Sequence, residues 1–217
     1  VIATSDRPFN LSLAIESVLG QTVPCHEILV VGDHCKAETA EVLAGIAEPR
    51  LRYVNLPHRC GEQSTPNSVG MALATGDVLA FLNHDDLWLP DHLETSLDAL
   101  ADPTVDLVTT AAGIALTDPK SGMPMVAEIS ASHRTLRDAF FHPNFWFEPI
   151  STWVVRRETA LMIGPFSPAA TLYRMSPQNW LLRARRAGIS YRDRPTVTVL
   201  KDGFDWGGQR YKSLSAV

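Results

Sequence analysis

Short apolar runs alternate with helix-spaced apolar residues through the first hundred positions, and this alternation limits the fold more than any other feature of the chain. The strands predicted from them cover residues 1–3, 27–31, 51–55 and 77–82, and a segment with helical spacing follows each of them. Strands that alternate with helices of this length form a mostly parallel sheet with helices on both faces. We therefore predict an α/β fold.

Prolines and capping residues mark where the helices begin and end. Asn10 and Gly20 are the candidate N-cap and stop of the first helix, while Pro66 and Pro90 open two later ones. The pattern is less regular beyond residue 100, where we predict strands at 105–110, 151–155 and 196–200 and helices at 158–163 and 177–187. Since 217 residues suffice for one large core, we predict a single domain over residues 1–217.

The charge and cysteine content exclude several classes of function. The net charge is −5, with basic and acidic residues mixed throughout, so there is no basic stripe and we expect no nucleic-acid partner. Three cysteines without a CxxC pair indicate neither a disulfide framework nor a zinc site, which favours a reducing, cytoplasmic location. No apolar run approaches the ~20 residues of a transmembrane helix. The chain starts at Val1 inside an apparent strand, so a missing upstream segment and peripheral membrane association stay open.

Polar residues follow three of the predicted strands at the point where each strand ends. Thr4 follows the first, Asp33 the second, and the pair Asp85 and Asp86 the fourth. Ligands of open α/β sheets bind outside the carboxyl ends of the strands. We expect these side chains to share one edge of the sheet and to form a binding site there.

The chemistry of these side chains suits a nucleotide and a metal ion. Adjacent carboxylates are hard oxygen ligands of the kind that Mg²⁺ or Mn²⁺ prefers, and one or two suffice when a diphosphate completes the shell. Asp33 and Thr4 can hydrogen-bond a base or a ribose. In the plainer interpretation, Asp85 and Asp86 cap the following helix and Asp33 is a turn residue beside Gly32.

The histidines and tryptophans carry weaker signals. No HxxxH or HExxH spacing is present, so we expect His84 and His92 to be surface or supporting residues rather than metal ligands. We expect Trp146, Trp153 and Trp180 in the core rather than in a sugar-stacking platform, whereas Trp88, which follows the acidic pair, can lie in either place.

Four segments together resemble glycosyltransferase family 2. Residues 1–8 are similar to its opening strand, 14–22 to its first helix, 27–33 to its nucleoside-binding strand, and 76–90 to its acidic metal motif. Residues 150–157 and 163–166 also look familial. The resemblance implies a GT-A fold, with a nucleotide-sugar donor half over 1–100 and an acceptor half over 101–217. It also implies transfer of a sugar from a UDP-, GDP- or dTDP-sugar to a hydroxyl acceptor, usually with inversion.

The same resemblance assigns roles to single residues. Thr4 and Asp33 would hold the base, Asp85 the ribose or diphosphate, and Asp86 the Mn²⁺ or Mg²⁺ ion. Asn83 stands where the family has the first acid of the motif, so it accepts hydrogen bonds from the donor but brings no charge.

The resemblance breaks down at the catalytic base. The family carries an acidic pair about seven residues before a helix-end arginine, and counting back from Arg183 gives Ser176 and Pro177, which cannot take a proton. Either the alignment is shifted, or Glu148, or less favourably Asp118, supplies the base, or the chain has lost transfer. The alternative function is therefore a non-catalytic nucleotide-sugar-binding protein. A nucleotidyltransferase or dinucleotide-dependent oxidoreductase is disfavoured, since neither GxGxxG nor a Walker motif is present.

Overall fold

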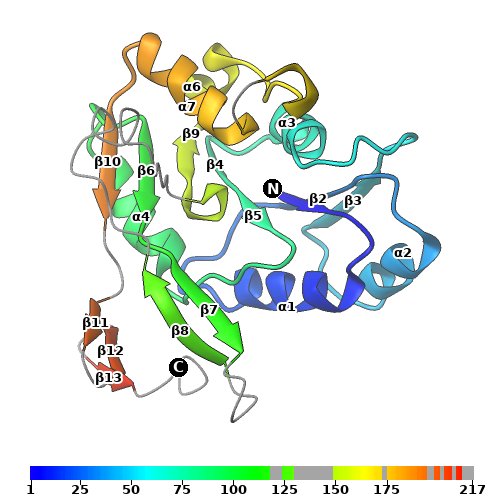
Figure 1. The fold of residues 1–217 in the computed structure, drawn as a ribbon, viewed down its shortest axis with the longest axis horizontal. Helices are drawn as coiled ribbons and strands as arrows, with labels where there is room; N and C mark the ends of the chain where they lie inside the picture. The colour runs from blue at the N-terminus through cyan, green and yellow to red at the C-terminus, as the bar shows by residue number, and fades with distance from the viewer. Residues whose placement is uncertain are drawn as a thin grey trace.

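Four parallel strands form the sheet that carries the first half of the chain (Figure 1). Their order is β3-β2-β1-β5, with β1 at Ile2–Thr4, β2 at Ile28–Gly32, β3 at Leu51–Asn55 and β5 at Leu82–Asn83. The computed structural model describes residues 1–117, 124–129, 149–172, 175–194, 198–200, 203–206 and 209–211. The predicted α/β fold with a parallel sheet is confirmed.

Helices cover both faces of this sheet. In Figure 1, α1 (Pro8–Leu19) and α2 (Ala37–Ala44) lie on one side and α3 (Ser64–Leu73) on the other. Ile28 and Val30 of β2 pack in one apolar cluster with α1, whereas Leu29 packs in a different cluster with α3. Because both faces are buried, β2 reads as a continuous apolar run rather than an alternating one.

The first helix begins three residues earlier than an N-cap at Asn10 predicts. Pro8 is its first residue and no side chain caps it. A proline at the first helical position has its φ already set for the helix and lacks an N–H that would stay unpaired there. The predicted stop at Gly20 is confirmed.

A second, mixed sheet carries the later strands. Its order is β10-β6-β9-β4, with β10 at Tyr191–Arg194, β6 at Leu107–Thr110, β9 at Val154–Arg156 and β4 at Val78–Ala80. The helices α4 (His92–Leu100), α6 (Arg157–Ile163) and α7 (Ser176–Arg186) accompany it. The remaining elements are the pair β7 (Gly113–Thr117) and β8 (Pro124–Ile129), the 3-10 turns η1 (Ile150–Thr152) and η2 (Ala169–Thr171), and the small sheet β11 (Thr198–Leu200), β12 (Gly203–Trp206) and β13 (Gln209–Tyr211).

The single strand predicted at 77–82 is wrong, because the chain changes sheets at Phe81. β4 pairs with β9, and β5, two residues later, pairs with β1. The Phe81 amide donates to the Trp153 carbonyl at 3.2 Å, and the Phe81 ring meets Phe166 edge to face at 5.6 Å. This crossing brings η1, which precedes β9, beside β5, and there the two halves of the chain meet at the site.

Aromatic residues fill the core between the second sheet and α7. Trp153 and Trp180 are fully buried, with ring centroids 5.7 Å apart, and Phe166 stacks on Trp180. The expectation that Trp153 and Trp180 are core residues is confirmed, whereas Trp146 lies outside the described residues. The predicted strand at 151–155 is shorter, since η1 occupies its beginning.

Candidate functional site

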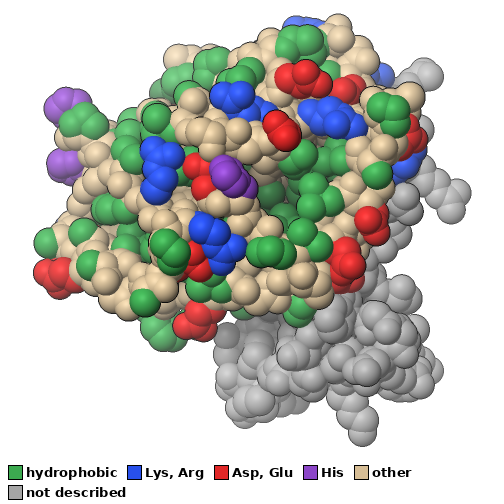
Figure 2. All heavy atoms as spheres, turned by 180° about the vertical axis from the view of Figure 1, so that it is seen from behind, with side chains coloured by type: hydrophobic (Ala, Val, Ile, Leu, Met, Phe, Trp, Pro, Cys, Tyr) green, Lys and Arg blue, Asp and Glu red, His purple; other side chains and the backbone are tan. Residues whose placement is uncertain are grey.

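A cavity of about 460 Å³ opens at the carboxyl ends of β1, β2 and β5. Both halves of the chain line it, through Ala3, Thr4, Ser5, Asp33, Arg59, Gly61, Glu62, Gln63, Pro66, Asn83, His84, Asp85, Ala169, Met175, Ser176 and Pro177. The predicted gathering of Thr4, Asp33 and the acidic loop at one edge of the sheet is confirmed. On the face shown in Figure 2, acidic and basic side chains lie interspersed around a hollow with apolar walls.

A second cavity, of about 280 Å³, lies at the opposite ends of the strands. It is lined mainly by apolar groups from the starts of β1, β2 and β4, among them Val1, Ile28 and Val78. Trp88 lines this second cavity; its indole N–H donates to the Ser151 carbonyl and its ring stacks on His92 at 4.7 Å. Burial lowers the pKa of His92 to about 4, so it is neutral there. The charged and polar side chains line mainly the 460 Å³ cavity, which we take as the candidate site.

Asp33 is a buried carboxylate that holds a loop. It is 3% exposed, and its two oxygens accept hydrogen bonds from the Cys60 and Gly61 amides at 2.6 and 2.7 Å. Its own amide donates to the Thr4 carbonyl, which ties β2 to β1. Gly61 has φ +76°, a conformation that favours glycine. Asp33 thus shapes the cavity wall over residues 60–61.

The loop after β1 is fixed by a second carboxylate. Asp6 has φ 46°, and its carboxylate accepts hydrogen bonds from the Lys36 amide and from Arg59. The Lys36 amide, followed by the charge of Arg59, lowers the pKa of Asp6. Arg59 also donates to the Ser5 hydroxyl at 2.9 Å. These bonds hold the Arg59 guanidinium at the cavity wall.

In the acidic loop, residues 83–86, some polar groups hold the loop in place and others line the cavity. Asp86 accepts hydrogen bonds at one oxygen, Oδ2, from the Ser151 hydroxyl and from the Asn83 amide group. The Asn83 backbone N–H donates to the Ser151 hydroxyl at 3.0 Å, which closes the network. Asp86 therefore joins the loop to η1, the turn that precedes β9, and it is not among the residues that line the cavity.

Asp85 faces the cavity with a partly exposed carboxylate. Its side chain is 44% exposed, and Oδ2 lies 3.1 Å from an Arg7 guanidinium nitrogen and 3.9 Å from Nε2 of His84. Within the described residues no group of three or more His, Cys, Asp or Glu side chains is placed to hold a metal ion. An ion at this loop would thus need ligands from the bound molecule as well.

Three buried side-chain atoms at the cavity have no hydrogen-bond partner. They are Oγ1 of Thr4, Oε1 of Gln63 and Nε2 of His84. An unpaired buried polar atom costs about 1–3 kcal/mol, so such atoms are unusual in a finished core. The described residues hold five further atoms of this kind outside the cavity lining, but these three are placed to bond a polar ligand in the cavity.

The two residues at the predicted position of the base lie in the cavity wall, and neither can act as a base. Ser176 and Pro177 line the cavity, and the Ser176 hydroxyl donates to the Ser167 carbonyl at 2.6 Å. The two positions reached by counting back from Arg183 therefore lie at the candidate site. Glu148 and Asp118 lie outside the described residues.

Sequence reasoning missed several residues of this site. Arg59 and Gln63 belong to no motif, and His84 was expected to be a supporting residue. Ser151 stands at the start of residues 150–157, which look familial, but its bond to Asp86 spans 65 positions and leaves no local signal.

Comparison with known proteins identifies the family. The model for Glycosyl transferase family 2 matches residues 1–161. The chain belongs to this family. A curated relative, the succinoglycan biosynthesis protein ExoW of Rhizobium meliloti, is 36% identical over 90 residues, which are 40% of this chain and 28% of ExoW. The match thus covers less than a third of that relative.

Solved structures show the same GT-A fold. A mannosyltransferase from Pyrobaculum calidifontis in complex with GDP-Man and Mn²⁺ superposes with a TM-score of 0.65 at 18% identity, covering 89% of this chain and 53% of that one. TarS from S. aureus in complex with UDP-GlcNAc gives 0.57 at 18% identity, covering 84% and 52%. Within the described part of this chain, no helix has the length and apolar character to span a bilayer.

Proposed function

We propose that this family 2 protein binds a nucleoside-diphosphate sugar in the 460 Å³ cavity and transfers the sugar to an acceptor hydroxyl with the help of a divalent metal ion. The observation that carries the proposal is the placement of Thr4, Asp33 and Asp85 at one sheet edge, beside unpaired buried polar atoms. The GDP-Man and UDP-GlcNAc complexes of two structural neighbours support a donor of this class.

The nucleoside end of the donor fits the side of the cavity near β1 and β2. Thr4 Oγ1 is buried without a partner and is a ready hydrogen-bonding group for a base or ribose. Both oxygens of Asp33 already accept an amide hydrogen bond, so this carboxylate reaches a base only through its remaining lone pairs. Arg59 adds a cation for the diphosphate.

The residues of the acidic loop fit a Mn²⁺ or Mg²⁺ ion in part. The sequence assigned the ion to Asp86, and that assignment stays a prediction. The geometry favours Asp85, whose carboxylate lines the cavity, whereas one oxygen of Asp86 is held by Ser151 and Asn83. A bound ion would neutralise charge on the departing diphosphate. The protein contributes the loop carboxylates and the hydrogen bonds from Ser151 and Asn83 that hold the loop in place.

Transfer with inversion needs a group that removes the proton of the acceptor hydroxyl. Ser176 and Pro177 cannot do so, and we keep Glu148 as the proposed base, since it precedes Pro149 in an aromatic stretch. Replacing Glu148 with Gln should lower turnover by about 10²–10⁴ and leave donor binding unchanged. Glu158→Gln on the exposed start of α6 is the matched control. Unchanged turnover in Glu148→Gln would remove Glu148 from the mechanism.

Calorimetric titration of UDP, GDP and dTDP, each with Mn²⁺ and with EDTA, tests the proposal. We expect one nucleoside diphosphate to bind, and to bind more tightly with Mn²⁺. Binding that EDTA leaves unchanged would contradict the metal part of the proposal, and no binding to any of the three would contradict the donor site.

The absence of a proton acceptor at Ser176 and Pro177 favours a second candidate, a protein that binds the nucleotide sugar without turning it over. It predicts metal-dependent binding of the nucleoside diphosphate and no release of sugar from the matching donor. Slow donor hydrolysis that is lost in Asp85→Ala would exclude it.

A further inference from the structure

The acidic loop of this chain has one negative charge fewer than its motif normally carries. Asn83 stands at the first acidic position and uses its side-chain N–H to hold Asp86. With Asp86 engaged at one oxygen by Ser151 as well, Asp85 is the loop carboxylate that faces the cavity. One carboxylate and a diphosphate are the smallest set that holds a divalent ion, so a second protein ligand beside Asp85 would strengthen its binding.

His84 places a second donor atom beside that carboxylate. Its Nδ1 lies 3.2 Å from the Ala3 carbonyl. Since a carbonyl oxygen only accepts, Nδ1 must carry the hydrogen, and in the neutral ring Nε2 then holds a free lone pair. This is the tautomer that metal-bound histidines adopt when a carbonyl fixes the other ring nitrogen.

The surroundings of Nε2 fit a metal ligand. Nε2 is buried and has no hydrogen-bond partner, and the imidazole lines the cavity. It lies 3.9 Å from Oδ2 of Asp85, which is too long for a hydrogen bond. Two metal–ligand bonds of ~2.1 Å span up to ~4.2 Å, so one ion can contact both atoms.

The same oxygen of Asp85 already takes a cationic partner. Arg7 contacts Oδ2 at 3.1 Å, and its side chain is 58% exposed. An exposed arginine on a flexible side chain is easily displaced, because such an ion pair contributes little free energy. Nε2 lies beside the negative charge of the Asp85 carboxylate, so its partner is more favourably a cation than a phosphate oxygen.

We propose that His84 Nε2 and the Asp85 carboxylate together bind the divalent ion, so that a neutral nitrogen ligand takes the place of the carboxylate that is missing at Asn83. This inference rests on the proposed function. Its consequence is a changed metal preference: a mixed nitrogen and oxygen site favours Mn²⁺ over Mg²⁺, which prefers oxygen ligands alone.

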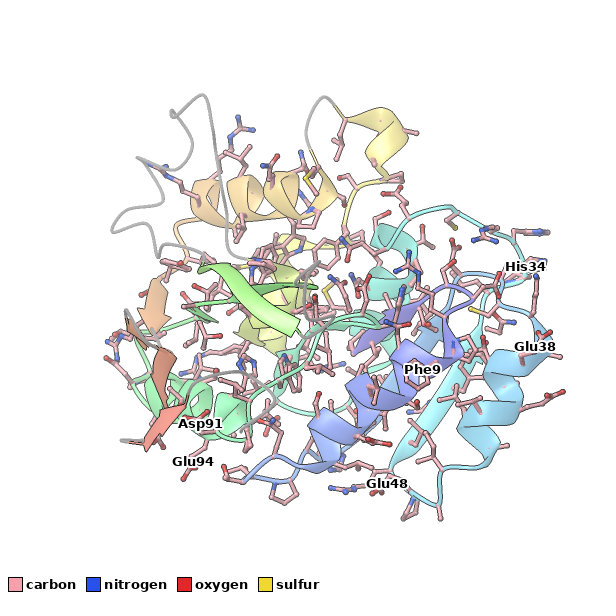
Figure 3. All side chains as sticks on the ribbon, turned by 60° about the horizontal axis from the view of Figure 1, so that its bottom comes forward. Phe9, His34, Glu38, Glu48, Asp91 and Glu94 are labelled. Atoms are coloured by element: carbon pink, nitrogen blue, oxygen red, sulfur yellow. The ribbon has the colours of Figure 1, made fainter. Side chains whose placement is uncertain are left out.

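Pulsed electron paramagnetic resonance of bound Mn²⁺ tests the ligand directly. The protein is loaded with Mn²⁺ alone and with Mn²⁺ plus UDP, GDP or dTDP, and the electron spin echo is examined for coupling to a directly bonded ¹⁴N. We expect the coupling in the wild-type chain and its loss in His84→Gln, together with at least about tenfold weaker Mn²⁺ binding. His34→Gln, an exposed histidine after β2 that Figure 3 labels, is the matched control and should keep the coupling.

A second pair of variants guards against misfolding of His84→Gln. Asn83→Asp restores the missing acid and should raise Mg²⁺ affinity relative to Mn²⁺. The double variant Asn83→Asp with His84→Gln should recover Mn²⁺ binding without the nitrogen coupling. Mn²⁺ bound without coupling in the wild-type chain, or coupling that survives in His84→Gln, would overturn the inference while leaving the donor site intact. Failure of every nucleoside diphosphate to bind would instead overturn the proposed function.

Discussion

Asp33 and Asp85 both follow a strand of the same parallel sheet and both line one cavity, yet their surroundings differ sharply. Asp33 is 3% exposed and accepts two short backbone hydrogen bonds, whereas the Asp85 side chain is 44% exposed and pairs with one flexible arginine. A buried carboxylate with paired oxygens builds the wall of a site. A half-exposed one with a displaceable partner is free to bind a ligand.

The same contrast separates Asp85 from its neighbour Asp86. Asp86 fastens the loop to Ser151 and therefore joins the first sheet to the second, while Asp85 points to the cavity. Two adjacent acids that look equivalent in the sequence thus have different partners. A sequence motif thus identifies the residues of a site, but it does not show which of them binds the ligand.

Replacing Asp85 with Ala should have the largest effect. Metal assistance contributes several kcal/mol, and each 1.36 kcal/mol is tenfold, so we expect a loss of about 10²–10³ in kcat/KM for donor turnover. Metal-dependent binding of the nucleoside diphosphate should disappear in calorimetry. Glu38→Ala on α2, an exposed acid labelled in Figure 3, is the control and should behave as wild type.

Asp86→Ala, measured in parallel, decides between the two acids. If Asp86 only holds the loop, metal-dependent binding should persist in weakened form, and Asp86→Asn should preserve more of it because the amide oxygen still accepts from Ser151. If metal-dependent binding is lost completely in Asp86→Ala and retained in Asp85→Ala, then Asp86 and not Asp85 binds the ion.

Asp33→Asn should show an intermediate effect, and on stability rather than on metal binding. Its amide oxygen can accept one of the two loop hydrogen bonds, but its NH₂ group then faces the second backbone N–H. We expect a loss of about 1–3 kcal/mol in the free energy of unfolding, measured in urea. Weaker nucleoside diphosphate binding should accompany it with Mn²⁺ and with EDTA alike. An unchanged unfolding midpoint would show that the loop at Cys60 and Gly61 does not depend on Asp33.

Arg7→Ala should have the smallest effect, and of opposite sign. Arg7 competes with a metal ion for Oδ2 of Asp85. An exposed ion pair contributes about 0.2–1 kcal/mol, so its removal should tighten Mn²⁺ binding by a factor of about 1.4 to 5. Lys36→Ala, a basic residue outside the cavity lining, serves as the control for the loss of one positive charge. Weaker Mn²⁺ binding in Arg7→Ala would indicate that Arg7 supports the ion instead of competing with it.

Much of the first half could be predicted from local patterns. The third strand was placed at its observed bounds, and the edge where Thr4, Asp33 and Asp85 meet followed from the rule that parallel strands open their sites at one end. The split at Phe81 could not be predicted, because the change of sheet depends on pairing with Val154–Arg156, more than 70 positions away.

By itself, the sequence determined the α/β class, the family and the residues that gather at the sheet edge, because strand and helix periodicity and short motifs are local properties. Only the tertiary structure decided which of these residues hold the site together and which face the cavity. It tied Asp86 to Ser151, left Asp85 facing the cavity, and aimed the free nitrogen of His84 beside it. The physical reason is that hydrogen-bond partners and burial are set by segments far apart in the chain, and these decide which polar atoms stay unpaired and free to bind.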